Sequence, residues 1–531
     1  MDGSCIFLGL SPITFILVGI VLVLCYLYST WTFSTFKKMG IPGPPPTPLF
    51  GNMLQIRKGM HTKEQEWIQK YGKVFGTYEG RRPVINFADP EICKQITVKH
   101  FSSFVNRRPV PLRGKPMDSN LTVLRGDQWK EVRNTLTPSF TAAKMKLMAP
   151  LINQCANDLV ENMETHCKEE KTVKCKDLYG AFGMDSIASA GFGLDVSSQS
   201  QPGHPFVENA KEALKFTLLS PVMIIVFFLP FLVPIMNYFN MSLYPSKVVK
   251  YFSCVIEDAI AMRKTTKDIN NQRIDFLQLM VNAHEVYDQH MANKDKEIDE
   301  DEGENKVDFV KDGPSSQIKL HKGFTEDEIL AQSLMFFFAG YETTSSLMSF
   351  VSYNLATNPE AQERLQREID DVISNSDDLG YNTIASMKYL DMVVMETLRM
   401  YPSSIRFNRQ CNEDVNINGI SIPKGMLVAV SIYSIHHDSD IYPDPEKFIP
   451  ERFSKEEKEK RHPYAWIPFG AGPRNCIGMR FALMEAKIGL VRVLQKFTFE
   501  PCAETQIPPE LGKMGLLTPL DGIKLGVKRR K

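Results

Sequence analysis

An uncharged, strongly apolar run at the start of the chain limits what this sequence can fold into. No charged residue occurs from Gly3 to Phe36, and Ile, Leu, Val, Phe and Tyr dominate from Ile6 to Trp31. A helix of about 20 apolar residues is long enough to cross a bilayer. We therefore predict an N-terminal transmembrane anchor over residues 1–36, so the remaining chain must fold beside a membrane.

The flanking charges predict how this anchor is oriented. A cleaved signal peptide has a shorter apolar core, a basic start and a small-residue cleavage site, whereas here Asp2 precedes a long core. The basic residues follow the core, at Lys37, Lys38, Arg57 and Lys58. By the positive-inside rule, the chain after the anchor lies in the cytosol. A buried core helix is a second alternative, which the length of the run disfavours.

The stretch that follows the anchor is rich in proline. Five prolines fall within Met39–Gly51, MGIPGPPPTPLFG. Proline cannot continue a helix, and it pushes the preceding residue toward extended backbone. We expect residues 37–51 to form a stiff hinge that holds the body at a set angle to the anchor. A flexible, disordered linker is the alternative.

A second uncharged region runs from Phe216 to Ser246. Its length would allow a second span, but Pro221, Pro230 and Pro234 divide it, and a proline inside a helix costs about 3 kcal/mol. A second span would also carry the C-terminal half across the bilayer. We expect residues 216–246 to form short helices that dip into the bilayer surface. A buried core element is the competing interpretation.

Composition bounds the partners and the compartment. The 62 basic and 62 acidic residues balance, which gives no support for a nucleic-acid partner. Ten scattered cysteines form no CxxC pair, as is usual in a reducing compartment. Charged residues concentrate in 288–322, where aromatic residues are few. We expect a flexible charged surface loop there.

The rest of the chain predicts a mainly helical body with a minor β portion. Apolar residues recur at spacings of three and four in Pro359–Ser376 and Met387–Pro402, which predicts helices. Strand-like pieces occur in Lys73–Ala88 and Gly419–His436. We assign residues 52–531 to one domain.

Glycines crowd around one cysteine in PFGAGPRNCIGMRFA, Pro468–Ala482. Gly470 and Gly472 permit turns closed to other residues, and Gly478 removes a side chain just beyond Cys476. Bare backbone can approach a flat ligand, and its N–H groups can stabilise a thiolate. A buried cysteine by itself is more often a small hydrophobe. This loop, with a helix after it, favours a thiolate held under a large flat cofactor.

At these residues the chain resembles the cytochromes P-450, the heme-thiolate monooxygenases. FGAGPRNCIG resembles their heme-binding loop. AGYETT, FVNRRP, PERF and CAETQIP are most similar to the vertebrate microsomal family 3 (3A-like), which hydroxylates drugs and steroids. The resemblance covers the whole chain. It implies a mainly α fold with a minor β region and heme b between a long central helix and the cysteine loop. It also implies that Cys476 is the axial iron ligand. Thiolate ligation of heme iron favours cleavage of the O–O bond.

The resemblance also implies which residues hold the two heme propionates. Guanidinium groups suit carboxylates best. Trp129 and Arg133 are four residues apart, so they share a helix face. A surface arginine is the alternative for each cation, and Arg108 could replace its neighbour Arg107. The implied propionate contacts are Arg107, Trp129, Arg133, Arg409 and Arg474.

A further motif has a structural role by the same resemblance. Glu396 and Arg399 lie three residues apart in ETLR, and Arg452 belongs to PERF. The resemblance implies that these three form a buried ionic cluster that shapes the cysteine loop. The alternative is a surface ion pair worth less than about 1 kcal/mol. The apolar neighbours of Glu396 favour burial.

The apolar stretch Ile329–Phe350 carries polar residues at its centre. A glycine inside a helix, here Gly340, costs roughly 1 kcal/mol, and a threonine there can bond back to the helix and bend it. We expect a local opening that admits dioxygen and water. The resemblance places Thr343 beside dioxygen and Glu342 at a proton relay, as the catalytic residues. A simple helix kink is the alternative.

The implied activity is that of an unspecific monooxygenase, which inserts one oxygen atom of O2 into bulky lipophilic substrates such as steroids and foreign chemicals. Electrons would come from NADPH through a flavoprotein, NADPH–cytochrome reductase, because no convincing GxGxxG nucleotide site is present. Cytochrome b5 is a further expected partner. The expected location is the endoplasmic reticulum membrane, with the catalytic domain on the cytoplasmic side.

Two other functions stay open at the sequence level. A heme-thiolate isomerase of fatty peroxides, similar to thromboxane synthase, needs neither dioxygen nor a reductase. A heme-binding sensor or carrier has no turnover. The oxygen-side threonine, Thr343, favours the monooxygenase because an isomerase can dispense with it.

The resemblance finally aligns seven positions with the walls of a substrate pocket. Most are apolar, which suits bulky lipophilic molecules, although Arg406 could select an acidic group. The positions are Thr122, Phe338, Ser404, Ile405, Arg406, Met514 and Leu516.

Overall fold

The computed structural model describes residues 12–110, 112, 114–169, 172–201, 203–214, 222, 225–226, 232–265, 275–284, 324–374, 379–513 and 515–530. Four parts of the sequence predictions lie outside these residues: positions 1–11 of the anchor, most of 216–231, the charged stretch 288–322, and Met514.

Helices make up most of the described chain, as the sequence predicts. The predicted helices Pro359–Ser376 and Met387–Pro402 are confirmed as α14 (Pro359–Ser374) and α16 (Lys388–Met400). The other long helices of the body are α3 (Met60–Tyr71), α5 (Gly126–Leu136), α6 (Ala142–Lys168), α7 (Cys175–Ser186), α8 (Pro205–Leu214), α11 (Ser246–Thr265), α13 (Glu326–Thr357) and α19 (Met479–Lys496). Shorter ones are α4 (Pro90–Lys94), α10 (Val233–Tyr238), α15 (Tyr381–Ser386), α17 (Ile432–His436) and α18 (Lys455–Glu459).

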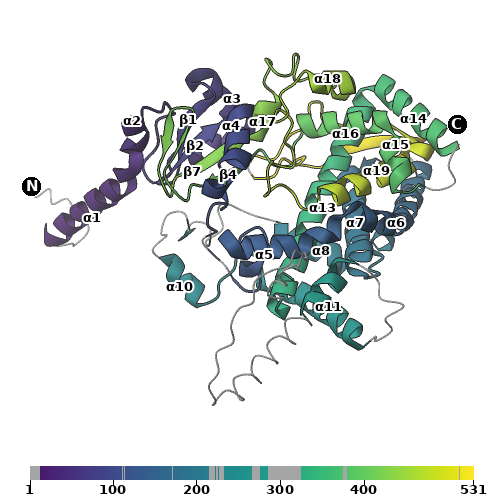
Figure 1. Ribbon diagram of the computed structural model, residues 1–531, viewed down its shortest axis with the longest axis horizontal. Helices are drawn as coiled ribbons and strands as arrows, with labels where there is room; N and C mark the ends of the chain where they lie inside the picture. The colour runs from purple at the N-terminus through teal and green to yellow at the C-terminus, as the bar shows by residue number, and fades with distance from the viewer. Residues whose placement is uncertain are drawn as a thin grey trace, which may run out of the picture.

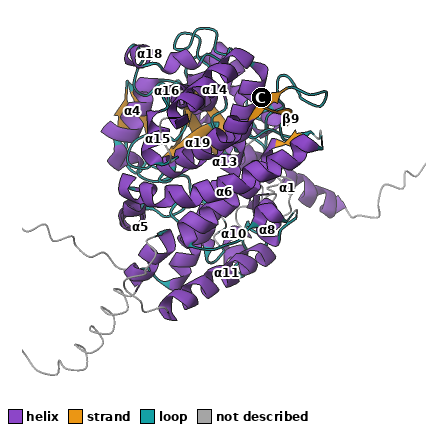
Figure 2. Cartoon of the chain, turned by 90° about the vertical axis from the view of Figure 1, so that its right-hand side faces the viewer, coloured by secondary structure: helices purple, strands orange, loops and turns teal. Residues whose placement is uncertain are grey.

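Helix α13 runs through the centre of the helical body (Figures 1 and 2). It begins with a capping box, in which the Thr325 hydroxyl accepts from the Glu328 N–H and the Glu328 carboxylate accepts from the Thr325 N–H. Almost every residue from Ile329 to Ala356 is buried. A helix that is apolar on all sides must be covered on all sides, which explains its central position.

Four strands form the main sheet, in the order β1 (Val74–Glu79), β2 (Arg82–Phe87), β7 (Leu427–Ser431), β4 (Arg406–Gln410). The β2–β7 pair is parallel and the other two pairs are antiparallel. The two strand-like stretches of the sequence therefore pair with each other. Smaller sheets contain β5 (Val415–Ile417) with β6 (Ile420–Ile422), and β3 (Val173–Lys174) with β9 (Lys524–Arg529) and β8 (Phe497–Glu500).

The N-terminal apolar run is a helix that projects from the sheet end of the body (Figure 1). It comprises α1 (Pro12–Thr30), a 3-10 turn (Trp31–Ser34) and α2 (Thr35–Met39). Within the described ranges, Pro12–Met39 is the one helix long and apolar enough to cross a membrane, with a mean hydropathy of 2.3. Most of α1 is exposed on every side.

The proline-rich stretch of the predicted hinge lies against the sheet. The N–H of Gly76 on β1 donates to the Pro42 carbonyl over 2.8 Å. A Cβ at Gly43 would lie 2.1 Å from the Gly76 carbonyl oxygen, so only glycine fits there. The Asn52 side chain also donates to the carbonyls of Pro44 and Pro45. Proline lacks an N–H, so this stretch can cover β1 without offering a strand edge of its own.

The described part of the second apolar region includes one short helix, α10. Met236 on this helix packs with Leu112 and Val226 in a small buried cluster. Tyr238 and Phe239 are 85% and 70% exposed. The helix therefore has one side against the body and leaves large apolar groups uncovered on the other.

Candidate active site

The cysteine loop is a tight turn between the sheet side of the body and α19. The N–H of Cys476 donates to the Phe469 carbonyl over 2.9 Å, which closes the loop. Gly470 and Gly472 both have φ of +71°. A Cβ at Gly472 would lie 1.9 Å from the Thr97 carbonyl oxygen. Glycine is therefore required at that position by both backbone angle and space.

The Cys476 side chain is exposed to solvent, although many protein atoms lie close to it. Burial raises the pKa of its thiol, while the Gly478 N–H and the charges of Arg133 and Arg107 oppose that rise. The loop thus presents a sulfur with an N–H donor and two cations nearby. These are the surroundings that stabilise a thiolate once a metal is bound.

Buried cations gather around this loop. Arg474 is 3% exposed and Arg409 is 2% exposed. Burial lowers the pKa of each to about 9, and repulsion from Arg107 adds to the effect. The Nε atoms of Arg409 and Arg474 are buried without a hydrogen-bond partner. None of Arg107, Arg133, Arg409 and Arg474 forms an ion pair with a carboxylate among the described residues.

The neutral partners of these arginines hold them in place. Arg474 donates to the carbonyls of Val105 and Leu124, each over 2.7 Å, and its guanidinium lies 4.7 Å from the centre of the Trp129 ring. Arg133, on the same helix as Trp129, donates to the carbonyl and the side-chain oxygen of Asn475. Helix α5 is thereby tied to the residue next to Cys476.

Arg107 and its neighbour Arg108 point to different partners. Arg108 forms an ion pair with Glu79 on β1, while Arg107 interacts electrostatically with Cys476. Of the two sequence candidates, Arg107 is the one placed at the cysteine. Several buried cations without counter-anions are costly unless an anion binds among them. The set therefore fits a dianionic flat group above Cys476, and the two carboxylates of heme match that requirement.

A buried ion cluster supports the loop from below. Glu396 and Arg399 are both 0% exposed and form a bidentate pair, with N–O distances of 2.7 and 2.9 Å. Arg452 Nε lies 3.3 Å from the same carboxylate, which also accepts the Ile449 N–H. Arg399 donates further to the carbonyls of His436 and Pro445. The cluster is buried, so it is not the surface ion pair that the sequence left open.

His436 connects this cluster to the cysteine loop. Its Nε2 accepts from the Ile467 N–H over 2.9 Å, so its Nδ1 carries the proton and donates to the Arg399 carbonyl over 3.2 Å. Ile467 begins the turn that leads to Phe469 and Cys476. Sequence reasoning assigned no role to His436, because nothing in a lone HHD stretch shows which backbone groups lie beside it.

The centre of α13 is less covered by the rest of the protein than the turns on either side of it. The helix is continuous from Glu326 to Thr357. Gly340 has a packing role, because a Cβ there would lie 2.7 Å from Ile187 Cδ1. Ala339 is exposed even though its helix is otherwise buried. The Thr343 hydroxyl donates back to the Ala339 carbonyl over 2.8 Å, as expected for a helical threonine.

Glu342 has a partner that the sequence did not reveal. Its carboxylate lies 2.5 Å from Lys176 Nζ on α7, and the Glu342 side chain is 13% exposed. It also lines one end of a cavity of about 650 Å³ beside the main sheet, here called the sheet cavity. No sequence spacing relates residues 176 and 342, so only the packing of α7 on α13 brings them together.

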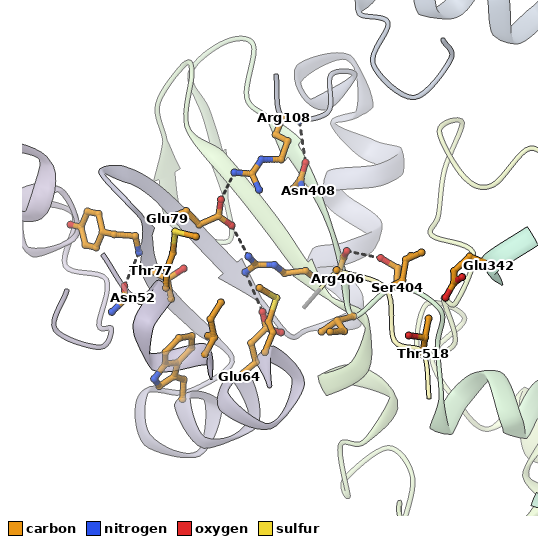
Figure 3. Close-up of a pocket in the computed structure, with 18 residues that line it drawn as sticks. Asn52, Glu64, Thr77, Glu79, Arg108, Glu342, Ser404, Arg406, Asn408 and Thr518 are labelled. Carbon is orange, nitrogen blue, oxygen red and sulfur yellow. Dashed lines mark hydrogen bonds and ion pairs between the residues drawn. The ribbon is translucent and has the colours of Figure 1, made fainter. Parts of the chain in front are cut away.

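The sheet cavity contains four of the seven predicted pocket positions: Ser404, Ile405, Arg406 and Leu516 (Figure 3). Thr122 and Phe338 do not line it. Thr122 bonds to Asn120 and its carbonyl faces Arg474, while Phe338 stacks on Tyr244 at 5.5 Å.

Arg406 is not free to select an acidic substrate, in contrast to the expectation from sequence. Its guanidinium donates to Glu64 over 3.1 Å, to Glu79 over 2.6 Å and to Asn86 over 3.0 Å (Figure 3). Glu64 is 0% exposed, and burial raises the pKa of its carboxyl. The positive charge of Arg406 is thus balanced by the carboxylates of Glu64 and Glu79. Sequence reasoning missed Glu64 and Glu79, which lie on elements far away in the chain.

Comparison with known proteins agrees with this geometry. The family model described as Cytochrome P450 matches residues 41–302 and 281–527. The chain belongs to the cytochrome P450 family. It is 43% identical to Cytochrome P450 3A5 of Homo sapiens and 42% identical to Cytochrome P450 3A29 of Sus scrofa, each over 98% of both chains. It is 44% identical to Cytochrome P450 3A9 of Rattus norvegicus over 97% of both.

These findings confirm the resemblance to the 3A group and the cytochrome P450 fold. Membership of the family implies heme bound through a cysteine thiolate.

The buried ion cluster makes a stability prediction. Glu396→Gln removes the negative charge and leaves Arg399 buried without compensation, so we expect a loss of about 3–5 kcal/mol. The measurement is the thermal unfolding midpoint together with the yield of folded protein. Glu451→Gln is the matched control, because its ion pair with Arg364 is about half exposed and should matter by less than about 1 kcal/mol. Equal effects of the two changes would contradict the role of burial.

Two buried histidines make a prediction about pH. Burial holds the pKa of His437 at about 3 and that of His436 well below 6.5. Below pH 6.5 the unfolded chain therefore binds protons that the folded chain does not, so stability falls as pH falls, by about 1.4 kcal/mol per pH unit for each histidine. His437→Gln should make unfolding less sensitive to acid between pH 6 and about 4. A pH dependence that His437→Gln leaves unchanged would contradict this prediction.

Proposed function

We propose that this cytochrome P450 is a heme-thiolate monooxygenase that draws electrons from NADPH through a membrane flavoprotein reductase and inserts one atom of O2 into bulky lipophilic substrates. One observation supports this most: the arginine set around Cys476 lacks acidic partners among the described residues, so the body is built to bind a dianionic cofactor. In the proposal, Cys476 is the iron ligand. Arg107, Trp129, Arg133, Arg409 and Arg474 hold the cofactor's carboxylates.

The ligand loop is kept in shape by charge buried beneath it. We assign Glu396, Arg399 and Arg452 a structural role, since they touch backbone carbonyls and each other and do not line the sheet cavity. When bound, heme supplies the chemistry that activates dioxygen. The protein's part is to orient the substrate, exclude water and deliver protons.

Two residues of α13 are proposed to handle protons. The Thr343 hydroxyl donates its hydrogen to the Ala339 carbonyl. The Thr343 hydroxyl oxygen can therefore still accept a hydrogen bond from a water molecule. The Glu342 carboxylate, paired with Lys176, faces the sheet cavity and can exchange protons with water there. A general acid within reach of the reacting oxygen typically raises the rate by about 10²–10⁴.

The substrate class follows from the walls. Ile405, Leu516, Trp67 and Met53 give the sheet cavity apolar faces. Its two arginines are already paired with carboxylates of the protein. Such walls favour large lipophilic molecules such as steroids and foreign chemicals. Thr122, Phe338 and Met514 stay in the proposal as pocket positions on the family resemblance alone.

The cellular setting is proposed from the N-terminal helix. Pro12–Met39 would anchor the protein in the endoplasmic reticulum membrane as a single span, and the basic residues after it favour a cytoplasmic body. The exposed Tyr238 and Phe239 would add a second, reversible contact with the bilayer. The reductase and cytochrome b5 are the proposed electron donors on that side.

Replacement of the proposed ligand tests the heme assignment. Cys476→Ala should lose the absorption band that thiolate ligation gives the reduced carbon monoxide complex. Cys155→Ala and Cys254→Ala, one buried and one exposed, should keep it. If the band persists in the Cys476 variant, the ligand is another residue.

Replacement of Thr343 separates the monooxygenase from the isomerase. Without the hydroxyl, the water that delivers protons is misplaced, so reduced oxygen should be released as hydrogen peroxide and water. Thr343→Ala should keep the heme spectrum and substrate binding while NADPH is consumed with much less product. The readout is the ratio of product formed to NADPH oxidised. Unchanged coupling, or turnover without any reductase, would favour the isomerase.

A further inference from the structure

The end of the membrane helix is docked on the β1–β2 hairpin by specific contacts. The guanidinium of Arg81, in the hairpin turn, lies 3.5 Å from the centre of the Tyr28 ring in the last turns of α1. The Thr32 hydroxyl donates to the Arg81 carbonyl over 2.6 Å. A direct cation–π and hydrogen-bond contact therefore joins helix and hairpin before the proline-rich stretch begins.

A small aromatic cluster completes this junction. The rings of Phe33 and Phe36 lie 5.0 and 4.9 Å from that of Tyr78 on β1. The Tyr78 hydroxyl donates to the Phe33 carbonyl and accepts the Phe36 N–H. Phe36 is 5% exposed, and a Cβ at Gly76 would lie 2.4 Å from its ring, so the strand is shaped to receive it.

Helix length fixes the depth of the hairpin turn. The 19 residues of α1 extend about 28 Å, close to the roughly 30 Å of a bilayer's hydrocarbon core. Tyr28 lies near the cytoplasmic end of that length, and Trp31 just beyond it is 77% exposed, as at a membrane interface. Because Arg81 contacts the Tyr28 ring, it must lie at the level of the lipid headgroups.

The hairpin turn also carries positive charge, which suits a position among lipid headgroups. The Arg81 guanidinium has no carboxylate partner among the described residues, and its Nε is buried and unpartnered. Arg82 beside it is exposed, as are Lys37 and Lys38, which directly follow the aromatic cluster in the chain. Arginine at the headgroup level pairs with phosphate, preferably of an anionic lipid.

We propose that the hairpin tip, Gly80–Arg82, binds an anionic phospholipid headgroup through Arg81 and that its docking on Tyr28 fixes the body against the bilayer. This inference rests on the proposal that α1 spans the membrane. Tyr78 and Glu79 just before the tip line the sheet cavity. The cavity therefore lies next to the headgroup layer, where amphiphilic substrates accumulate, so they reach it without crossing bulk water.

Photolabelling of the full-length protein in phosphatidylcholine vesicles that contain a minority of phosphatidylserine tests this. One probe carries the photoreactive group on the phosphatidylserine headgroup and the other carries it in the acyl chain. We expect the headgroup probe to label 80–82 and the acyl probe to label α1. Arg81→Gln should reduce headgroup labelling of 80–82 about fivefold, the loss expected for one basic residue at an anionic surface.

Two further variants sharpen the outcome. Tyr28→Leu keeps α1 apolar but removes the ring, and should reduce labelling of 80–82 as well; Arg529→Gln, an exposed cation on β9 at the other end of the molecule, should not. Two outcomes would overturn this inference: labelling of α1 without labelling of 80–82, or labelling of 80–82 that both Arg81→Gln and Tyr28→Leu leave unchanged. Neither outcome contradicts the proposal that α1 spans the membrane. Absence of acyl labelling on α1 overturns the anchor itself.

Discussion

The buried pair of Glu396 and Arg399 is the interaction on which the geometry of the site depends. A bidentate ion pair away from water is stable only if its remaining hydrogen-bonding groups are also satisfied. Here they are, because Arg399 reaches the carbonyls of His436 and Pro445 and Glu396 receives the Ile449 N–H. These contacts hold the backbone that follows β7. His436, in that segment, accepts a hydrogen bond from the Ile467 N–H at the start of the cysteine loop. The cluster does not line the sheet cavity, and its hydrogen bonds continue through His436 to the backbone that leads to Cys476.

The opposite arrangement of charge exists on the cofactor side of the loop. Below the loop, Arg399 and Arg452 lie against the Glu396 carboxylate. Around it, Arg409 and Arg474 are buried with unpartnered Nε atoms and no carboxylate partner among the described residues. A folded chain tolerates this only if an anion completes the set, so the uncompensated charge points to a bound group. The two sets of arginines therefore differ in their partners: one set is paired with a carboxylate and the other bonds only to neutral groups among the described residues.

The sheet region connects the N-terminal helix to α13. Tyr78 on β1 packs on the end of the N-terminal helix and also lines the sheet cavity, and Glu79 beside it belongs to the Arg406 and Arg108 ion pairs of that cavity. The cavity then extends to Glu342 on α13 (Figure 3).

The sequence by itself determined the features that depend on local spacing. The length of the apolar run, the glycine-ringed Cys476, the helical period of α14 and α16 and the strands around the hairpin all follow from residues close together in the chain, and the structure and the family match agree with them. The pairing of Glu396 with Arg399 was visible too, because a spacing of three places both on one helix face.

Tertiary structure alone decided the contacts between distant segments. No periodicity relates Arg406 to Glu64 and Glu79, which neutralise it, or Lys176 to Glu342. The role of His436, the choice between Arg107 and Arg108, and the need for Gly340 beside Ile187 likewise depend on which backbone lies opposite. The proline-rich stretch became a cover for β1 because Gly43 lets it approach Gly76. Local pattern specifies what a segment can form, whereas packing specifies what it meets.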